Sequence, residues 1–202
     1  AQELIRRPDA DIARADANLT NMIAQVDHAG GIVRRMRDFL RRGHPRVRTV
    51  DIPGVLDDAL MLASAEAAVK GIRLSLGESG KLPPVFGDRV QLQQVILNLI
   101  RNSIDAISET KRSGTIEVRA RQLPAPERVE FSVLDNGPGI DEETANRLFE
   151  PLMTSKHEGL GLGLPICTSI VEAHGGKIWL HSGAPGATEF RFTIPLENGR
   201  GS

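Results

Sequence analysis

Two glycine-rich strings and a pair of asparagines, in a fixed order, constrain this chain more than any other feature of its sequence. Asn98 and Asn102 come first, then Asp135-Asn136-Gly137-Pro138-Gly139-Ile140, and then Gly159-Leu160-Gly161-Leu162-Gly163-Leu164. Glycine-hinged loops let backbone amides approach phosphates, a carboxylate can bind the edge of a base, and asparagines on one helix face can hold a metal ion. The combination predicts a Mg-ATP site.

The spacing of the glycines excludes the two commonest nucleotide-binding motifs. A P-loop needs a Gly, four residues and then Gly-Lys-Ser/Thr, and a dinucleotide fingerprint needs G-x-G-x-x-G between a strand and a helix of one βαβ unit. Neither pattern occurs in the chain. The expected site therefore belongs to a less common nucleotide-binding class.

Composition sets wider bounds. The chain has 202 residues, of which 40% are hydrophobic, and this suits one domain or two small ones. A formal net charge of -1 argues against a general affinity for nucleic acid, and the single Cys167 excludes an internal disulfide. No apolar run approaches roughly 18 residues and no signal-peptide pattern is present, so we expect a cytoplasmic segment without direct membrane contact.

Apolar or small residues recur near the N-terminus in alternating steps of three and four, the pattern of a coiled coil or helical bundle. Further apolar residues at Ile23, Ile32 and Phe39 widen this stripe, which favours a four-helix bundle. One helix cannot bury such a face alone, so we expect a homodimer. The seam residues are Ile12, Ala15, Leu19, Met22, Val26, Ala29, Val33, Met36 and Leu40.

The helical region is expected to end at Gly43, because glycine is the favoured residue after a helix and Pro45 follows closely. This divides the chain into a helical region at 1–43, a basic linker at 44–50 and a mixed domain at 51–199.

Beyond the linker the pattern alternates between helix and strand. Runs of helix and then strand favour an α+β sandwich, in which helices cover one face of a mostly antiparallel sheet. Helices are expected at about 53–69, 90–107 and 162–173, and strands at about 72–76, 115–121, 128–134, 177–181 and 188–194.

The three motifs together resemble the N, G1 and G2 boxes of the sensor histidine kinase catalytic domain, most closely in oxygen-sensor kinases of the FixL type. The resemblance covers about residues 11–196. It implies the two-layer α/β ATP-binding sandwich shared with type II topoisomerases and MutL-type mismatch-repair proteins, preceded by part of a dimerization and phosphotransfer region. The flanks that agree are Gln91-Leu92-Gln93-Gln94-Val95-Ile96-Leu97, the F box Leu148-Phe149-Glu150-Pro151 and Ile170-Val171-Glu172-Ala173-His174-Gly175-Gly176.

Asn98, Asn102 and Asp105 fall at i, i+4 and i+7 on one face of the expected helix. Such a stripe can be a solvated surface, but asparagine is a poor helix former that competes for backbone hydrogen bonds. The resemblance implies that Asn102 is a Mg²⁺ ligand and that Asn98 lies beside the triphosphate or holds a metal-bound water. Both are candidate catalytic residues, and Asp105 shares their cofactor-binding face. The core-facing residues are Val95, Leu99 and Ile100.

Asp135 ends a strand and opens the first glycine string. An ionised carboxylate accepts a hydrogen bond from the adenine amino group but offers no donor to a guanine carbonyl, which suits a preference for ATP over GTP. Asp-Asn-Gly alone can form a tight turn, but the resemblance favours base recognition. Gly137 and Gly139 are then expected to let the backbone approach the base, with Ile140 in the same cofactor-binding segment.

The second glycine string, Gly159 to Leu164, immediately precedes an expected helix. A helix N-terminus offers unpaired amides and a positive dipole end to phosphates, and leucines alternating with the glycines are not typical of a flexible linker. Residues 151–161 are expected to form an ATP lid, in which Lys156 is either a phosphate contact or a solvated lysine. The resemblance implies that Thr188 lines the same pocket.

The phosphoacceptor box of histidine kinases, a His followed by an acid, an apolar residue and shortly a Pro, does not occur in the chain. His28 lacks the following acid and falls outside the seam, so we expect an exposed side chain in the second dimerization helix. The chain is expected to begin after the first such helix. The other histidines are expected in linker, lid or loop positions: His44, His157, His174 and His181.

The resemblance implies transfer of the ATP γ-phosphoryl group to a histidine and then to an Asp of a response regulator receiver domain. Two alternatives stay open. A same-fold ATPase or serine kinase would share the nucleotide site but would not need the helical region. A non-enzymatic dimeric module would use ATP only to set its conformation.

Overall fold

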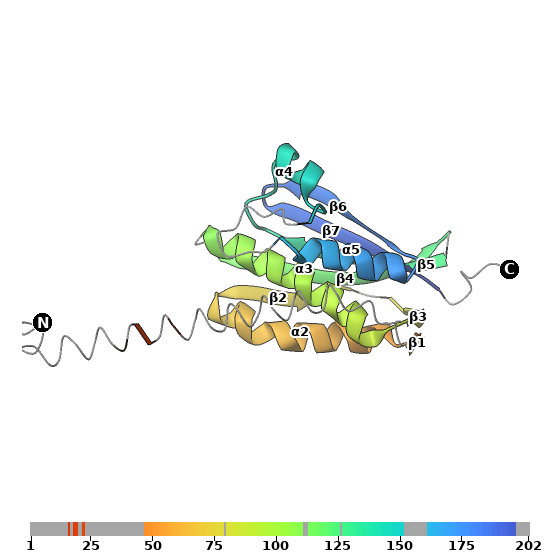
Figure 1. Ribbon diagram of the computed structural model, residues 1–202. Helices are drawn as coiled ribbons and strands as arrows, with labels where there is room; N and C mark the ends of the chain where they lie inside the picture. Colours follow the sequence, from red (N-terminus) through yellow and green to blue (C-terminus); the bar gives the residue numbers. More distant parts are fainter. Residues whose placement is uncertain are drawn as a thin grey trace, which may run out of the picture. The chain divides into compact units, whose positions relative to one another are not determined.

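The computed structural model describes residues 47–78, 80–110, 113–125, 127–151 and 161–196, together with Asp16, Asn18, Leu19 and Met22 (Figure 1). The chain divides into two units, residues 1–42 and 43–202. In the first unit the four described residues are helical, and the side chains of Leu19 and Met22 are 57% and 64% exposed. The rest of the predicted helical seam and His28 lie outside the described residues.

The second unit is built on a five-stranded sheet with the strand order β2-β4-β5-β7-β6. β2 runs parallel to β4, and the other neighbours are antiparallel, as predicted. The strands are β2 Ile72–Leu76, β4 Gly114–Pro124, β5 Glu127–Asp135, β6 Lys177–Ala184 and β7 Ala187–Pro195.

Three helices pack on one face of this sheet and form the second layer: α2 Ile52–Val69, α3 Arg89–Glu109 and α5 Gly163–Ala173 (Figure 1). α3 lies between the other two, and its residues Val95, Leu99 and Ile100 are fully buried, as predicted. Across the sheet, Phe131 and Phe192 stack with their ring centroids 4.5 Å apart. The α+β sandwich predicted from the sequence is confirmed.

The sequence suggested that residues 48–50 belong to the linker, but the structure shows that they form strand β1. β1 Arg48–Val50 pairs with β3 Val85–Gly87 in a small antiparallel ribbon, which sequence reasoning also missed. Three-residue strands are too short to show an alternating pattern. Val50 is nevertheless buried in the core of the second unit. The basic residues before it led the sequence analysis to predict a linker where an apolar side chain is packed.

The short helix α4 Glu142–Arg147 was also missed. Its described residues include no buried side chain, so it has no apolar face to detect. The available signal was its start: Asp141 accepts hydrogen bonds from the Thr144 amide at 2.9 Å and the Thr144 hydroxyl at 2.6 Å. An Asp at this position followed by Glu142 and Glu143 is a typical helix N-terminus.

His174 joins the end of α5 to the start of α3. Its Nδ1 lies 2.8 Å from the Ile170 carbonyl oxygen, and its Nε2 accepts the Asp88 amide at 2.9 Å. Only the neutral ring with its proton on Nδ1 can donate at one nitrogen and accept at the other. His174, expected in a loop, is therefore a buried structural residue that fixes how two helices of the site lie against each other.

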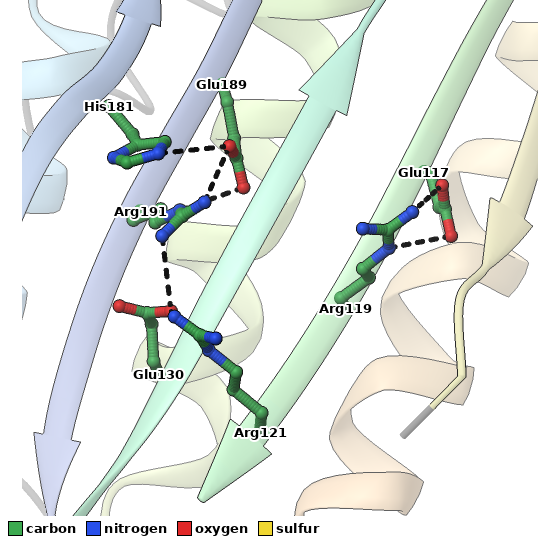
Figure 2. A network of polar contacts seen from close by, with 7 residues as sticks. All are labelled: Glu117, Arg119, Arg121, Glu130, His181, Glu189 and Arg191. Atoms are coloured by element: carbon green, nitrogen blue, oxygen red, sulfur yellow. Dashed lines mark hydrogen bonds and ion pairs between the residues drawn. The ribbon is translucent and has the colours of Figure 1, made fainter. Parts of the chain in front are cut away.

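The second face of the sheet carries a network of ion pairs (Figure 2). Glu130 alternates with the buried core residues of β5, so its side chain lies on the face away from the helices. Arg191 binds Glu189 through two hydrogen bonds of 2.9 Å and lies 3.6 Å from Glu130, which also binds Arg121. A buried carboxylate is thus held between guanidinium groups of two neighbouring strands.

Glu189→Gln is expected to lower the free energy of unfolding at neutral pH by about 1 kcal/mol, because two charge-assisted hydrogen bonds are weakened. Burial acts to raise the pKa of Glu189, but hydrogen bonds and charge from Arg191 outweigh it and lower the pKa. A carboxylate with a lowered folded pKa contributes stability above its unfolded pKa and loses it as pH falls through the folded value.

Chemical denaturation across the acidic range checks this prediction. The difference between the Glu189→Gln variant and the wild type should close as pH falls. Glu127→Gln on the exposed start of β5 is the matched control and should show little difference at any pH. A difference for Glu189→Gln that does not depend on pH would contradict the ion-pair explanation.

Candidate nucleotide site

Asp135 ends β5 and is 3% exposed. Its Oδ1 accepts the amide of Gly137 at 2.8 Å, and its Oδ2 accepts the hydroxyl of Ser103 at 2.7 Å. Thr188 also donates to this carboxylate from the paired position on β7. The carboxylate is therefore fixed by a turn, a helix and a neighbouring strand.

Burial is the largest influence on this carboxylate and raises the pKa of Asp135. The hydrogen bonds from Ser103, Gly137 and Thr188 favour the ionised form and oppose the rise in pKa. Buried carboxylates with few surrounding charges are costly in the folded state, and perturbed groups of this kind concentrate at functional sites. Asp135 has the environment expected of a ligand-binding group.

The first glycine string is tied to strands on both sides. Asn136 Oδ1 accepts the Thr115 amide at 2.7 Å, and the Asn136 amide donates to the Thr115 carbonyl at 3.2 Å. On the other side, the Ile140 amide donates to the Gly183 carbonyl at 2.9 Å, and the Gly186 amide donates to the Gly137 carbonyl at 2.8 Å. Hydrogen bonds to the protein on both sides therefore hold the backbone of this loop.

The structure gives local reasons for both glycines of this string. Gly139 has φ +88°, and a Cβ there would lie 2.8 Å from the Gly183 carbonyl oxygen and 2.8 Å from the Pro185 nitrogen. A Cβ on Gly137 would lie 2.7 Å from Asp135 Oδ1. Close packing within the protein thus requires these glycines, and backbone approach to a base stays a prediction.

The asparagine face of α3 lies against α5. Asn102 is half-buried, and its Oδ1 is 3.9 Å from the position of a Cβ added to Gly163, the first residue of α5. Asn98 is half-buried as well and forms a hydrogen bond to the Cys167 thiol of α5. Burial raises the pKa of Cys167 to about 12, so the sulfur is a neutral, unreactive contact. Asp105 is exposed on the same helix.

The second glycine string opens α5, as predicted. Leu162 occupies the N-cap without a side-chain hydrogen bond to the helix, and Gly161 before it has φ +62°. The first turn thus begins with amides, those of Gly163 and Leu164, that receive no side-chain cap. This is the geometry that binds anions at helix N-termini. Lys156, Gly159, Leu160 and lid residues 152–160 lie outside the described residues.

Ser103 belongs to this arrangement, and sequence reasoning did not single it out. It follows Asn102 on α3 and is 2% exposed. Its signal in the sequence was weak, because a serine beside a polar helix face reads as part of that face. Thr188, expected to line the pocket, is buried and donates a hydrogen bond to Asp135.

The three motifs meet at one point of α3. There Ser103 bonds to Asp135, and the neighbouring Asn102 lies beside Gly163 at the start of α5. Within the described ranges no group of three His, Cys, Asp or Glu side chains could hold a metal ion. The Asn102 amide oxygen is a ligand type that Mg²⁺ accepts, usually together with water and substrate phosphates. Asn102 is thus of a residue type that fits a Mg²⁺ ion.

No helix in the described part of the chain combines the length and apolarity needed to cross a bilayer.

Residues 87–198 match the family described as "Histidine kinase-, DNA gyrase B-, and HSP90-like ATPase". The chain is 35% identical over 193 residues to the C4-dicarboxylate transport sensor protein DctS of Rhodobacter capsulatus, covering 96% of this chain and 29% of DctS. It is also 35% identical over 188 residues to the sensor protein FixL of Bradyrhizobium diazoefficiens, covering 93% of this chain and 37% of FixL. The chain thus spans well under half the length of these relatives.

Solved structures of histidine kinases share the fold. The nucleotide-free catalytic domain of histidine kinase ThkA superimposes with a TM-score of 0.66 at 30% identity, over 74% of this chain and 95% of that domain. Full-length ShkA in complex with AMPPNP gives a TM-score of 0.77 at 29% identity, over 89% of this chain and 38% of the ShkA chain. ThkA in complex with response regulator protein TrrA gives a TM-score of 0.70 at 26% identity, over 90% of this chain and 50% of the matched chain.

The fold and the site define an ATP-binding catalytic domain. The chain belongs to the family of histidine kinase-, DNA gyrase B- and HSP90-like ATPases, and its α/β unit is the catalytic domain of a sensor histidine kinase. The prediction of an ATP-binding α+β domain of this family, with FixL among its relatives, is thereby confirmed.

Proposed function

We propose that this domain binds Mg-ATP where α3, the Asp135 turn and the start of α5 meet, and transfers the γ-phosphoryl group to a histidine for relay to a response regulator. One observation carries the proposal. The buried Asp135 is hydrogen-bonded to Ser103, whose neighbour Asn102 lies beside the uncapped N-terminus of α5. A base-recognising group, an amide oxygen and phosphate-binding amides are thus joined through one helix.

In this proposal Asp135 accepts a hydrogen bond from the adenine amino group, and the first amides of α5 bind phosphate oxygens. Asn102 offers its amide oxygen to Mg²⁺, and Asn98 lies one helical turn away on the same face. Bound Mg²⁺ would neutralise charge on the phosphates during transfer. The remaining residues proposed to contact the nucleotide are Gly137, Gly139, Ile140, Asp105, Lys156 and the glycine string 159–164.

The protein partners are part of the same proposal. The solved complex of ThkA with response regulator TrrA supports a receiver domain as the partner. A homodimer through the N-terminal helical region is supported by the exposed Leu19 and Met22, since apolar side chains at seam positions favour association. The proposal places the chain in the cytoplasm, where ATP is available, without nucleic acid or membrane as partners.

Incubation with γ-labelled ATP and a separately supplied acceptor helix tests this function. Acid-labile label on the acceptor histidine is expected, with little label on the 202-residue chain alone. Acid-stable label would indicate a serine kinase, and phosphate release without labelling would indicate an ATPase. Binding without either product would indicate a non-enzymatic module. Stoichiometric labelling of His28 in the chain alone would make His28 the acceptor.

Asn102→Ala is expected to weaken ATP binding about tenfold in the presence of Mg²⁺, the effect of losing one contact to a charged group. The loss should be much smaller in EDTA, because a metal ligand contributes only when metal is present. Titration calorimetry under both conditions measures the difference. Equal losses with and without Mg²⁺ would indicate a structural asparagine instead of a metal ligand.

A further inference from the structure

The hydrogen bond between Ser103 and Asp135 is buried at both ends. Its length is 2.7 Å, from Ser103 Oγ to Asp135 Oδ2, and the two residues are 2% and 3% exposed. It joins the middle of the core-facing side of α3 to the end of β5. A hydroxyl placed here in place of an apolar side chain must be satisfied by a partner, and Asp135 is that partner.

We propose that Ser103 is a positioning residue that fixes the Asp135 carboxylate in the orientation that accepts the adenine amino group, and so sets the selectivity of the site for adenine. The proposal rests on the function proposed above, in which Asp135 recognises the base.

The geometry of the carboxylate supports this role. The final torsion of an aspartate side chain is broad, so a single hydrogen bond leaves the carboxylate plane poorly defined. Gly137 binds Oδ1 from the same turn, whereas Ser103 binds Oδ2 from a different element. Two donors on the two oxygens define the plane. Without Ser103 the donors Gly137 and Thr188 would remain, and Oδ2 would lose its constraint from α3.

The number of hydrogen bonds also supports this role. An ionised carboxylate has about four acceptor positions. Gly137, Ser103 and Thr188 donate to Asp135 in the structure. The protein donors leave room for about one further donor, and the adenine amino group provides one. Since Ser103 is adjacent to Asn102, the same turn of α3 would align the base contact with the contact to the phosphates.

A comparison of two nucleotides separates this role from a general structural one. ATP and purine riboside triphosphate, which lacks the 6-amino group, are titrated into the full chain and into its Ser103→Ala variant. We expect the variant to bind ATP about fivefold more weakly, because a misoriented carboxylate keeps only part of its hydrogen bond to the adenine amino group. Its affinity for the analogue should stay within about twofold of the wild-type value, because no amino group is there to be recognised.

Two further variants serve as controls. Ser103→Cys keeps the shape of the side chain, with a slightly larger atom that donates only weakly, and it should lose selectivity as the alanine variant does. It also keeps the test valid if Ser103→Ala fails to fold. Ser108→Ala removes another hydroxyl of the same helix. That hydroxyl donates to the Ile104 carbonyl oxygen at a distance of 2.6 Å and is not a donor to Asp135. This variant should leave the affinities for both nucleotides unchanged.

Equal weakening of ATP and the analogue in Ser103→Ala would overturn the proposal and make Ser103 a packing residue. Unchanged affinity for both nucleotides would overturn it as well. If the wild type itself does not distinguish ATP from the analogue, base recognition by Asp135 fails, and with it this part of the proposed function. Discrimination by the wild type that persists in both Ser103 variants overturns only the role of Ser103.

Discussion

Asp135→Asn is expected to weaken ATP binding roughly tenfold to a hundredfold while raising the free energy of unfolding at neutral pH. The loss of binding follows from the loss of a charge-assisted hydrogen bond worth roughly 1.5 to 3 kcal/mol. An asparagine keeps one acceptor for the Gly137 amide, and its amide group can donate to the Ser103 hydroxyl oxygen. It has no anionic oxygen to accept a hydrogen bond from the adenine amino group.

The gain in stability follows from the direction of the pKa shift. Burial raises the pKa of Asp135 above its ordinary value. A carboxyl group with a raised folded pKa contributes stability below its unfolded pKa and loses it as pH rises through the folded value. The neutral amide does not lose stability in this way, so the advantage of the variant should grow from acidic to neutral pH.

Thermal unfolding at several pH values and titration with ATP check the two effects of Asp135→Asn on the same preparation. Asp57→Asn removes one negative charge at an exposed position of α2 and is the matched control. It should change neither property. An Asp135→Asn variant that loses stability at neutral pH would contradict the stability argument from burial. A variant that binds ATP like the wild type would contradict the base-binding role.

Gly139→Ala is expected to destabilise the domain by about 3 kcal/mol, combining a left-handed backbone with overpacking. The residue has φ +88°, which alanine tolerates poorly, and the added Cβ would press against the backbone at Gly183 and Pro185. Backbone atoms of a hairpin cannot turn aside as a flexible side chain can. The β6–β7 turn would have to shift, and with it the strand position of Thr188 beside Asp135.

Gly186→Ala provides a control for the backbone conformation alone. Gly186 has φ +79°, similar to that of Gly139, but a Cβ there has nothing within 4 Å. The control should cost about 1 kcal/mol. Denaturant unfolding of both variants gives the packing contribution as the difference. Equal losses would show that the hairpin accommodates the Cβ and that only the backbone conformation requires glycine.

Much of the domain could be predicted from the sequence because its long elements carry clear periodic patterns. The predicted strand at 72–76 and helix at 162–173 differ from the observed elements by at most one residue at each end. β1, β3 and α4 were missed because three to six residues are too few for a period to emerge. These short elements are held by pairing and capping, which depend on partners elsewhere in the chain.

The candidate site divides in the same way. Asp135, the asparagines and the glycines could be singled out because their residue types are unusual for the elements that carry them. Ser103 could not, since its importance depends on a contact between α3 and β5 that no local pattern records. The packing that requires glycine at position 139 is its close approach to the β6–β7 turn. This contact too exists only in the assembled domain.

The parallel pairing of β2 with β4 has a consequence for how the domain folds. Parallel neighbours cannot be joined by a tight turn, and the chain between these two strands contains α3. β2 can therefore pair with β4 only after the connecting segment, which includes the helix bearing Asn98 and Asn102, has packed across the sheet. Contacts so distant in sequence form slowly. A half-folded chain would lack both the sheet edge and helix α3, so nucleotide affinity should report complete folding of the domain.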